Sequence, residues 1–389
     1  MESVRTDRLE DTEVLFILVR AGLWEKVPEN LSLFPRSSES WERIFNLAQR
    51  QTVTGLVYQG LCQLPDELLP PEQQLLHWVA TIDRIERANL RMNRVLTELY
   101  GLFHTNGLHP VLQKGQGIAR FYEKPLLREC GDIDFYFSDK EESRQAASLV
   151  SQMGCRVSPK ADDSLCYYWK GVNVEHHTRL TDLRSPFIRK YLYKQEQDPA
   201  NLTSFRLPGN PTEITIPSPL LNLILLNTHI MKHAFGWGIG LRQLCDLTRA
   251  YHCLQTETDG KALYDLCRKA GIIRWNSLLH AFLVKQLGLP ASSLPYPEKT
   301  VSPEPLLEII LRGGNFGLYH AQRRNTAENK WSSKFHTFRS FLGNIRFSCR
   351  YAPQEAFWTF TNLLTGHDRI SILCSRILFQ SFAPGRTGC

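Results

Sequence analysis

The chain has 389 residues, of which 42% are hydrophobic and 22% charged, and its formal net charge is +7. This length suits two or three domains, and the composition excludes a disordered chain. No basic segment followed by an apolar one opens the chain, so a secretory signal is not expected. The most apolar run, residues 219–226, is too short to cross a bilayer. We therefore expect a cytoplasmic protein with no transmembrane segment.

The ten cysteines form no Cys-x-x-Cys pair and no His/Cys group at zinc spacing. Such a pattern is typical of reduced thiols rather than of a disulfide framework or a zinc site.

Residues 1–107 are predicted to be helical. Short amphipathic segments lie around Phe16 and from Ser40 to Arg43, and a long one runs from Pro71 to Phe103. Asn106-Gly107 predicts its end, because both residues tolerate the left-handed backbone that closes helices. This region offers packing surfaces and no evident chemistry.

The stretch from His109 to Phe137 predicts a strand, a glycine turn, a short helix, a loop and a second strand. Asp132 and Asp134 lie on the second strand and point the same way, about 6.6 Å apart, because side chains alternate along a strand. An Asp-x-Asp pair can simply end a strand at a solvated loop. Here the apolar residues around the pair indicate a buried strand, where unpaired carboxylates are costly and where Mg²⁺ finds the oxygen ligands it prefers.

A helix and further strands are predicted after the aspartates. Ser138 to Glu141 forms a capping-box pattern, and Gly154 predicts the end of that helix. Three short strands are then expected, the last two joined at Lys170-Gly171: Cys155–Val157, Leu165–Trp169 and Val172–His177. These elements predict a small mixed sheet from about residue 108 to 180.

Glu175 and His177 share one polar face of the last predicted strand. If that strand lies beside the strand of Asp132 and Asp134, Glu175 becomes a third carboxylate at the same site. Three carboxylates around phosphates can hold two cations roughly 3.5 to 4 Å apart, which activate an attacking hydroxyl and stabilise the leaving phosphate.

The order of these motifs carries a resemblance. The motifs follow one another as Lys114-Gly115, Arg128, Asp132-Ile133-Asp134 and Val174-Glu175-His176-His177. This order resembles the nucleotidyltransferase superfamily with the polymerase-beta-like fold, and most closely a poorly characterised bacterial branch of it. Two positions depart from the pattern: Gln113 replaces a leucine, and Gln116 replaces the Gly or Ser that commonly follows the first glycine.

The resemblance implies a role for each matched residue. Asp132 and Asp134 would ligate Mg²⁺, and Glu175 would be a second-metal ligand or the catalytic base. Lys114 would meet phosphate charge, and Gly115 would let the backbone approach the triphosphate. Two further residues would serve nucleotide binding. Arg128 would contact phosphate or orient the aspartates. His177 matches the histidine that follows the third acidic residue in the family pattern. His177 has a second interpretation, a histidine satisfied on a sheet face.

From Pro217 onwards the sequence again predicts helices. His229 and His233 are four residues apart, so they share one helix face. They suggest a metal pair, a nucleotide- or acceptor-contacting helix, or a polar cluster satisfied in the core. Leu289 to Leu306 contains five prolines and predicts a surface loop.

The C-terminal segment from His320 to Cys389 contains ten basic and three acidic residues, an excess of 10 − 3 = +7 that equals the whole net charge. Aromatic residues alternate with the cations. This pattern fits single-stranded nucleic-acid binding, but we favour amphipathic helices whose aromatic residues are core. Ile370 to Phe382 could also lie on a membrane surface.

We therefore predict an α+β protein with a small mixed β-sheet core flanked by N-terminal and C-terminal helical regions. The expected regions are a helical one over 1–107, a nucleotidyltransferase core over 108–216, and a helical one with the basic aromatic tail over 217–389. The resemblance implies an Mg²⁺-dependent, ATP-binding transferase that moves a nucleoside monophosphate from a nucleoside triphosphate to RNA, protein or a small molecule. The alternative is a non-catalytic protein of the same fold that binds RNA or an acidic partner.

Overall fold

The computed structural model describes residues 2–160, 164–236, 238–297, 301–314 and 338–365. Its helices are α1 (Glu2–Trp24), α2 (Ser38–Gln51), α3 (Thr54–Leu61), α4 (Glu72–Thr105), α5 (Gln116–Ala119), α6 (Lys140–Gln152), α7 (Pro186–Gln197), α8 (Pro219–Phe235), α9 (Leu241–Cys253), α10 (Gly260–Lys269), α11 (Ile273–Leu287), α12 (Glu304–Gly313), α14 (Ile345–Tyr351) and α15 (Pro353–Thr365). Its strands are β1 (Val111–Leu112), β2 (Asp132–Tyr136), β3 (Ser158–Pro159), β4 (Leu165–Trp169), β5 (Val172–His177), β6 (Leu202–Arg206) and β7 (Glu213–Pro217). The predicted α+β class is confirmed.

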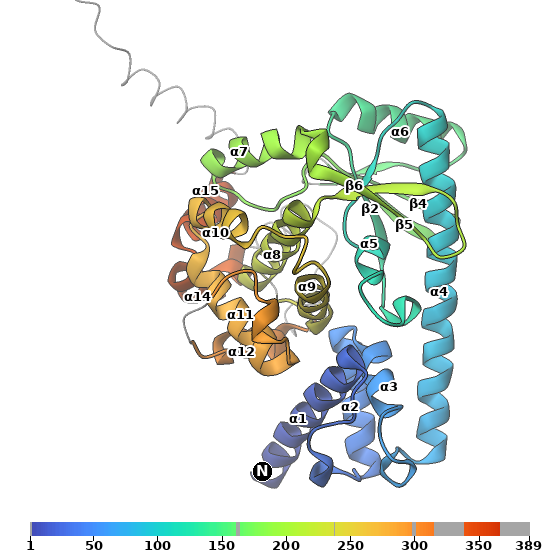
Figure 1. The fold of residues 1–389 in the computed structure, drawn as a ribbon, viewed down its shortest axis with the longest axis vertical. Helices are drawn as coiled ribbons and strands as arrows, with labels where there is room; N and C mark the ends of the chain where they lie inside the picture. The colour runs from blue at the N-terminus through green and yellow to red at the C-terminus, as the bar shows by residue number, and fades with distance from the viewer. Residues whose placement is uncertain (1, 161–163, 237, 298–300, 315–337, 366–389) are drawn as a thin grey trace, which may run out of the picture.

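The N-terminal helices α1, α2 and α3 pack together, and α4 runs from them to the sheet (Figure 1). Gly60 of α3 makes the crossing with α1 possible, because a Cβ at this position would lie 2.1 Å from the carbonyl oxygen of Leu18. At 34 residues, α4 is about 51 Å long. Its C-terminal half covers the sheet, with Phe103 packed edge-on against Phe135 and Phe137.

The central sheet has the strand order β1-β2-β5-β4-β3. Strands β2 and β5 are parallel, whereas the other pairs in this sheet are antiparallel. A parallel pair needs a long crossover connection, which α6, β3 and β4 supply between β2 and β5. The buried core of the sheet draws on β2, β4 and β5 together with α4, α6 and the separate hairpin of β6 and β7.

The predicted strands Leu165–Trp169 and Val172–His177 are confirmed to the residue as β4 and β5. Lys170 and Gly171 between them have φ of 47° and 80°, as a tight turn requires. The strand predicted at Cys155–Val157 is wrong, and β3 instead occupies Ser158–Pro159. The amide of Cys155 donates to the carbonyl of Val150 at 3.1 Å, so this segment completes the C-terminus of α6.

One other local prediction is wrong, and one is correct except at its end. The cap of α6 is Asp139 rather than Ser138, since the Asp139 carboxylate accepts from the amide of Glu141 at 3.0 Å. The loop predicted for Leu289–Leu306 ends early, because α12 begins at Glu304. Pro305 falls in the first turn of α12, where a helix loses no hydrogen bond to a proline.

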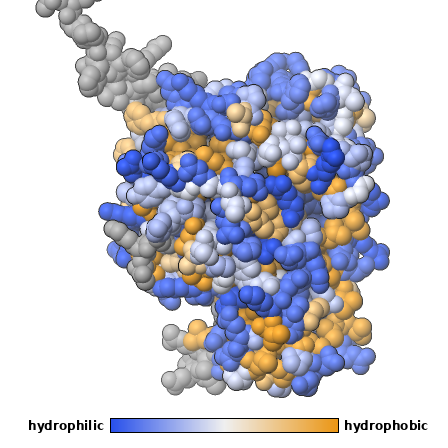
Figure 2. Space-filling model, viewed as in Figure 1, coloured by the Kyte–Doolittle hydropathy of each residue, from blue (hydrophilic) through white to orange (hydrophobic). Residues whose placement is uncertain are grey.

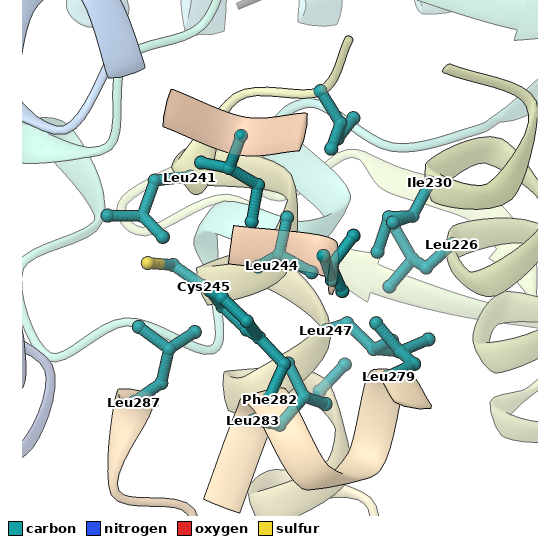
Figure 3. Close-up of a cluster of buried hydrophobic side chains, with 14 of the residues drawn as sticks. Leu226, Ile230, Leu241, Leu244, Cys245, Leu247, Leu279, Phe282, Leu283 and Leu287 are labelled. Carbon is teal, nitrogen blue, oxygen red and sulfur yellow. The ribbon is translucent and has the colours of Figure 1, made fainter. Parts of the chain in front are cut away.

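Helices α8, α9 and α11 form the largest buried core, together with residues of α1 to α3. Figure 3 shows this cluster, in which Leu226 of α8, Leu244 of α9 and Phe282 of α11 face one another. The three side chains are at most 4% exposed. The described part of the tail joins the same core: Phe341 is 2% exposed, and the ring of Phe347 lies 6.0 Å from that of Phe235. For these residues the core interpretation is confirmed.

Residues 315–337 and 366–389 lie outside the described residues, so the predictions for Ile370–Phe382 and for most of the basic tail stay predictions. In the view of Figure 2, hydrophilic residues cover most of the surface, and hydrophobic ones gather over the N-terminal helices at its foot. Within the described ranges, no helix is both long enough and apolar enough to span a membrane.

Candidate active site

Strands β2 and β5 bring the acidic residues of the two motifs together. Their parallel register pairs Asp132 with Asn173 and Asp134 with Glu175. Residues in register on neighbouring strands project from the same face of a sheet. The prediction that Glu175 joins the two aspartates required β5 to lie beside β2, and this placement is confirmed. Asp134 is 8% exposed and Glu175 is 9% exposed, so both carboxylates are buried.

These carboxylates face a cleft of ≈450 Å³, a volume within the range of small-ligand sites. All the site residues predicted from the sequence line it: Lys114, Gly115, Arg128, Asp132, Asp134, Glu175 and His177. The rest of the lining comes largely from residues 178–184, from α8 and from the start of α9. One wall of the cleft thus belongs to the sheet and the other to helices of the C-terminal region.

Asp134 is a strongly stabilised carboxylate of the cleft. Its Oδ2 lies 3.3 Å from Lys114 Nζ, and its Oδ1 lies 2.8 Å from His177 Nε2. Burial by itself raises the pKa of a carboxyl group, but the Lys114 charge and the His177 hydrogen bond outweigh it and hold the Asp134 pKa far below its usual range. Asp134 is therefore ionised at neutral pH.

Asp132 behaves in the opposite way. The negative charge of Asp134 and partial burial raise the pKa of Asp132 to about 6, and Lys114 offsets only part of this effect. Glu175 adds to the repulsion. A bound cation would remove this penalty, because it places positive charge between the carboxylates.

The residues fit a divalent cation. Asp134, Glu175 and His177 each offer a ligand atom, and these atoms lie within 4.8 Å of one another. Asp132 is not a member of this cluster, although its carboxylate is close enough to interact electrostatically with the other two. Two of the three expected metal ligands, Asp134 and Glu175, thus belong to the cluster. His177 supplies the third atom, and its Nε2 lies 3.7 Å from Glu175 Oε2.

Glu175 has further partners that hold its carboxylate. Lys160, which precedes β4, forms an ion pair with Glu175 Oε1. Asn173 Nδ2 donates to the same oxygen at 3.2 Å. Lys160 was not predictable from the sequence, because it lies in a connection with no pattern that points towards the site.

The Lys114-Gly115-Gln116 turn joins β1 to α5. Gly115 has φ 55° and ψ −124°, a conformation that suits glycine rather than residues with a Cβ. Gln116 is buried and points away from the cleft, towards α4, where its Nε2 contacts Asn93. Cys130 Sγ donates to its Oε1 at 2.9 Å. Gln116 therefore anchors α5, which accounts for a large residue at a position where superfamily members commonly have a small one.

Arg128 lines the cleft, but its guanidinium is held by an acidic residue of α9. Its Nε and Nη2 donate to the two oxygens of Asp246, both at 2.7 Å. Tyr122 also donates to Asp246 at 2.7 Å. Burial alone lowers the pKa of an arginine, but the Asp246 charge raises that of Arg128 well above its usual range. The geometry makes Arg128 a link between the sheet wall and the helical wall.

Asp182 is a cleft residue that the sequence did not reveal. It accepts from Lys232 Nζ at 2.7 Å and contacts His229 Nδ1 at 3.1 Å. Burial and the nearby Lys114 charge lower the pKa of His229 to about 4, so this imidazole is neutral at pH 7. The ring of His233 lies 4.6 Å from that of His229, but neither histidine belongs to the metal-ligand cluster found among the described residues.

Comparison with protein families shows to which family the chain is related. A model of an uncharacterised nucleotidyltransferase family matches residues 37–286, well over half of the sequence. The chain belongs to this family. The match includes β1, β2, β5, α8 and α9, the elements that carry most of the cleft. No curated protein and no solved structure matches the chain. Family membership supports nucleotidyl transfer as the general chemistry of this fold.

Proposed function

We propose that this nucleotidyltransferase-family protein is an Mg²⁺-dependent enzyme that transfers a nucleoside monophosphate from a nucleoside triphosphate, such as ATP, to an acceptor hydroxyl. One observation carries the proposal. The carboxylates of Asp132, Asp134 and Glu175 face the same cleft as the Lys114-Gly115 turn. Carboxylates for metal ions and a basic glycine turn for phosphates are the two parts that phosphoryl-group transfer needs.

The proposed metal ligands are Asp132, Asp134 and Glu175, and His177 orients Asp134 through the 2.8 Å contact. Mg²⁺ bound here would polarise the α-phosphate and lower the pKa of the acceptor hydroxyl. A second ion is compatible with three carboxylates. His177 itself is a poorer ligand for Mg²⁺, which prefers oxygen.

The remaining roles follow from the positions of the side chains. Lys114 meets the charge of the phosphates while it holds Asp134 at 3.3 Å. Gly115 leaves the backbone of its turn open to the phosphates. The acceptor oxygen forms a bond to the α-phosphorus, the bond from that phosphorus to the bridging oxygen of the β-phosphate breaks, and pyrophosphate leaves. Glu175 accepts the hydroxyl proton or binds the second ion.

A labelling experiment tests this function. The protein is incubated with each α-³²P-labelled nucleoside triphosphate, Mg²⁺, and separate extracts of RNA, protein and small metabolites. We expect label to move to one acceptor class with wild type and not with Asp134→Ala. Asp83→Ala serves as the matched control, because Asp83 is an exposed carboxylate of α4 paired with Arg87 outside the cleft. Equal transfer of label by wild type and Asp134→Ala contradicts the proposal. Binding of RNA or of an acidic partner without any transfer of label supports the non-catalytic alternative.

A further inference from the structure

Helix α7 exposes a stripe of alternating aromatic and basic residues. Phe187 is 67% exposed and Tyr191 is 40% exposed. Lys190 and Lys194 are also exposed. These positions follow the i, i+3, i+4, i+7 spacing, so the four side chains share one face of the helix. We call this face the α7 stripe.

The opposite face of α7 is anchored in the protein. Ile188 is 5% exposed and Leu192 is 1% exposed. Glu196 is the only acidic residue of α7, and it is buried and accepts from Thr181 Oγ1 at 3.0 Å. The aliphatic side chains of the helix therefore face the core, and the exposed side carries rings and positive charge.

Two neighbouring elements extend the stripe. Trp358 of α15 has its ring 6.3 Å from that of Phe187, in an edge-on arrangement. Lys269, the last residue of α10, places Nζ 4.7 Å from the centre of the Tyr191 ring. The surface thus combines aromatic faces with cations from three helices.

The α7 stripe is also fixed in position relative to the cleft. Residues 178–184 line the cleft, and α7 begins two residues later. The carboxylate of Glu355 on α15 accepts from the amides of Arg184 and Ser185 at 2.7 and 3.0 Å. The last residue of that cleft segment and the start of α7 are therefore held by the same helix that supplies Trp358.

We propose that the α7 stripe binds single-stranded RNA and that this RNA is the acceptor class of the cleft. Bases stack on exposed aromatic rings without regard to sequence, and lysines beside the rings neutralise the phosphates. A helix on a membrane surface separates a broad apolar face from its basic face, whereas α7 mixes rings and lysines on one exposed face and buries Ile188 and Leu192. RNA also offers a hydroxyl on every ribose. The acceptor role rests on the proposed transfer function, whereas RNA binding by the stripe does not.

The test measures binding of full-length protein to a fluorescein-labelled single-stranded ten-nucleotide RNA of mixed sequence, without nucleotide or Mg²⁺. We expect salt-sensitive binding by fluorescence anisotropy. The variant Phe187→Ala/Tyr191→Ala is expected to bind at least tenfold more weakly, since each lost stack weakens binding. Lys190→Ala/Lys194→Ala should reduce both the affinity and its salt dependence.

A matched control is Tyr168→Ala/Lys26→Ala, which removes a 70% exposed ring of β4 and an exposed lysine elsewhere. It should bind RNA like wild type. Circular dichroism and thermal melting check that every variant remains folded. No RNA binding by wild type, equal binding by stripe and control variants, or stripe-dependent binding to phosphatidylserine vesicles in place of RNA overturns the proposal.

The same assay separates this inference from the proposed function. The binding assay contains neither nucleotide nor Mg²⁺, so it reports on the stripe whatever the outcome of the transfer assay. If RNA binds through the stripe but receives no label from any nucleoside triphosphate, the transfer function fails and the binding surface stands.

Discussion

The two walls of the cleft differ in both charge and construction. The sheet wall presents the carboxylates of Asp132, Asp134 and Glu175, which come from two adjacent strands. The helical wall presents the cations Lys232 of α8 and Arg242 of α9, beside the neutral imidazole of His229. A metal-bound triphosphate carries both charges, cationic where the ion lies and anionic along the phosphates. The carboxylates of the sheet wall therefore suit the ion, whereas the cations of the helical wall, together with Lys114 beside the sheet, suit the phosphates.

Substitutions on the sheet wall should reduce activity most. Replacing Asp134 by alanine removes a carboxylate that Lys114 and His177 hold in place. Since stabilisation of charge by a metal is worth several kcal/mol, we expect a loss of roughly a thousand-fold in kcat/KM for nucleotidyl transfer. Steady-state assays of Asp134→Ala measure it. Lys232→Ala on the helical wall should cost less, and a larger loss for Lys232→Ala contradicts this ranking.

The ion pair between Arg128 and Asp246, which joins the two walls, provides the next test. Asp246→Ala leaves the Arg128 guanidinium buried without its two carboxylate contacts. Breaking a buried ion pair from one side costs about 3–5 kcal/mol, so urea unfolding should show a loss of this size. The double variant Arg128→Met/Asp246→Leu should recover most of it, because no unpaired charge remains. A double variant as unstable as Asp246→Ala argues against the link.

The core behind the helical wall contains a buried histidine that should make the stability of the protein depend on pH. Burial lowers the pKa of His280 on α11 to about 3, below its ordinary value of 6.5. The unfolded chain therefore binds the proton more readily, and stability present above pH 6.5 is lost as pH falls towards 3. At pH 5 the loss is about 2 kcal/mol. Urea unfolding between pH 7 and pH 4.5 should show a shallower acid loss for His280→Asn, whereas an unchanged slope contradicts this assignment.

Helix caps on the two sides predict the smallest effects. Asp139 caps α6, behind the sheet, through one amide, and Asp259 caps α10, among the C-terminal helices, through two. Loss of such a cap typically costs about 1 kcal/mol. Thermal unfolding should therefore show a small destabilisation for Asp139→Ala and a somewhat larger one for Asp259→Ala. The reverse order would mean that the number of capped amides does not set the cost.

The sheet wall was largely predictable from the sequence because its signals are local. Alternation placed Glu175 and His177 on one face, and Lys170-Gly171 marked the turn between β4 and β5. The pairing of β2 with β5 remained conditional, since alternation does not specify the neighbour of a strand. The hairpin of β6 and β7 was missed. Thr203 and Ser204 of β6 are consecutive, exposed and polar, so this strand does not show a clear alternation of apolar and polar residues.

The helical wall was much less predictable because its contacts join distant residues. Arg128 and Asp246 are 118 positions apart, and Asp182 lies 47 positions from His229. No periodic pattern connects such pairs. Their partners follow only from the packing of α8 and α9 beside the sheet, which depends on the whole core.

The contacts of Glu355 bear on how much of the chain is needed for folding. Glu355 and the helix α1 lie outside residues 37–286, the segment that the family model matches. A protein trimmed to that segment would lose the acceptor for two amides beside the cleft and the Leu23 carbonyl that accepts from Arg249 Nη1 at 3.0 Å. We therefore expect the matched segment not to be a self-sufficient folding unit. We expect the smallest form that folds to include both flanking helical parts.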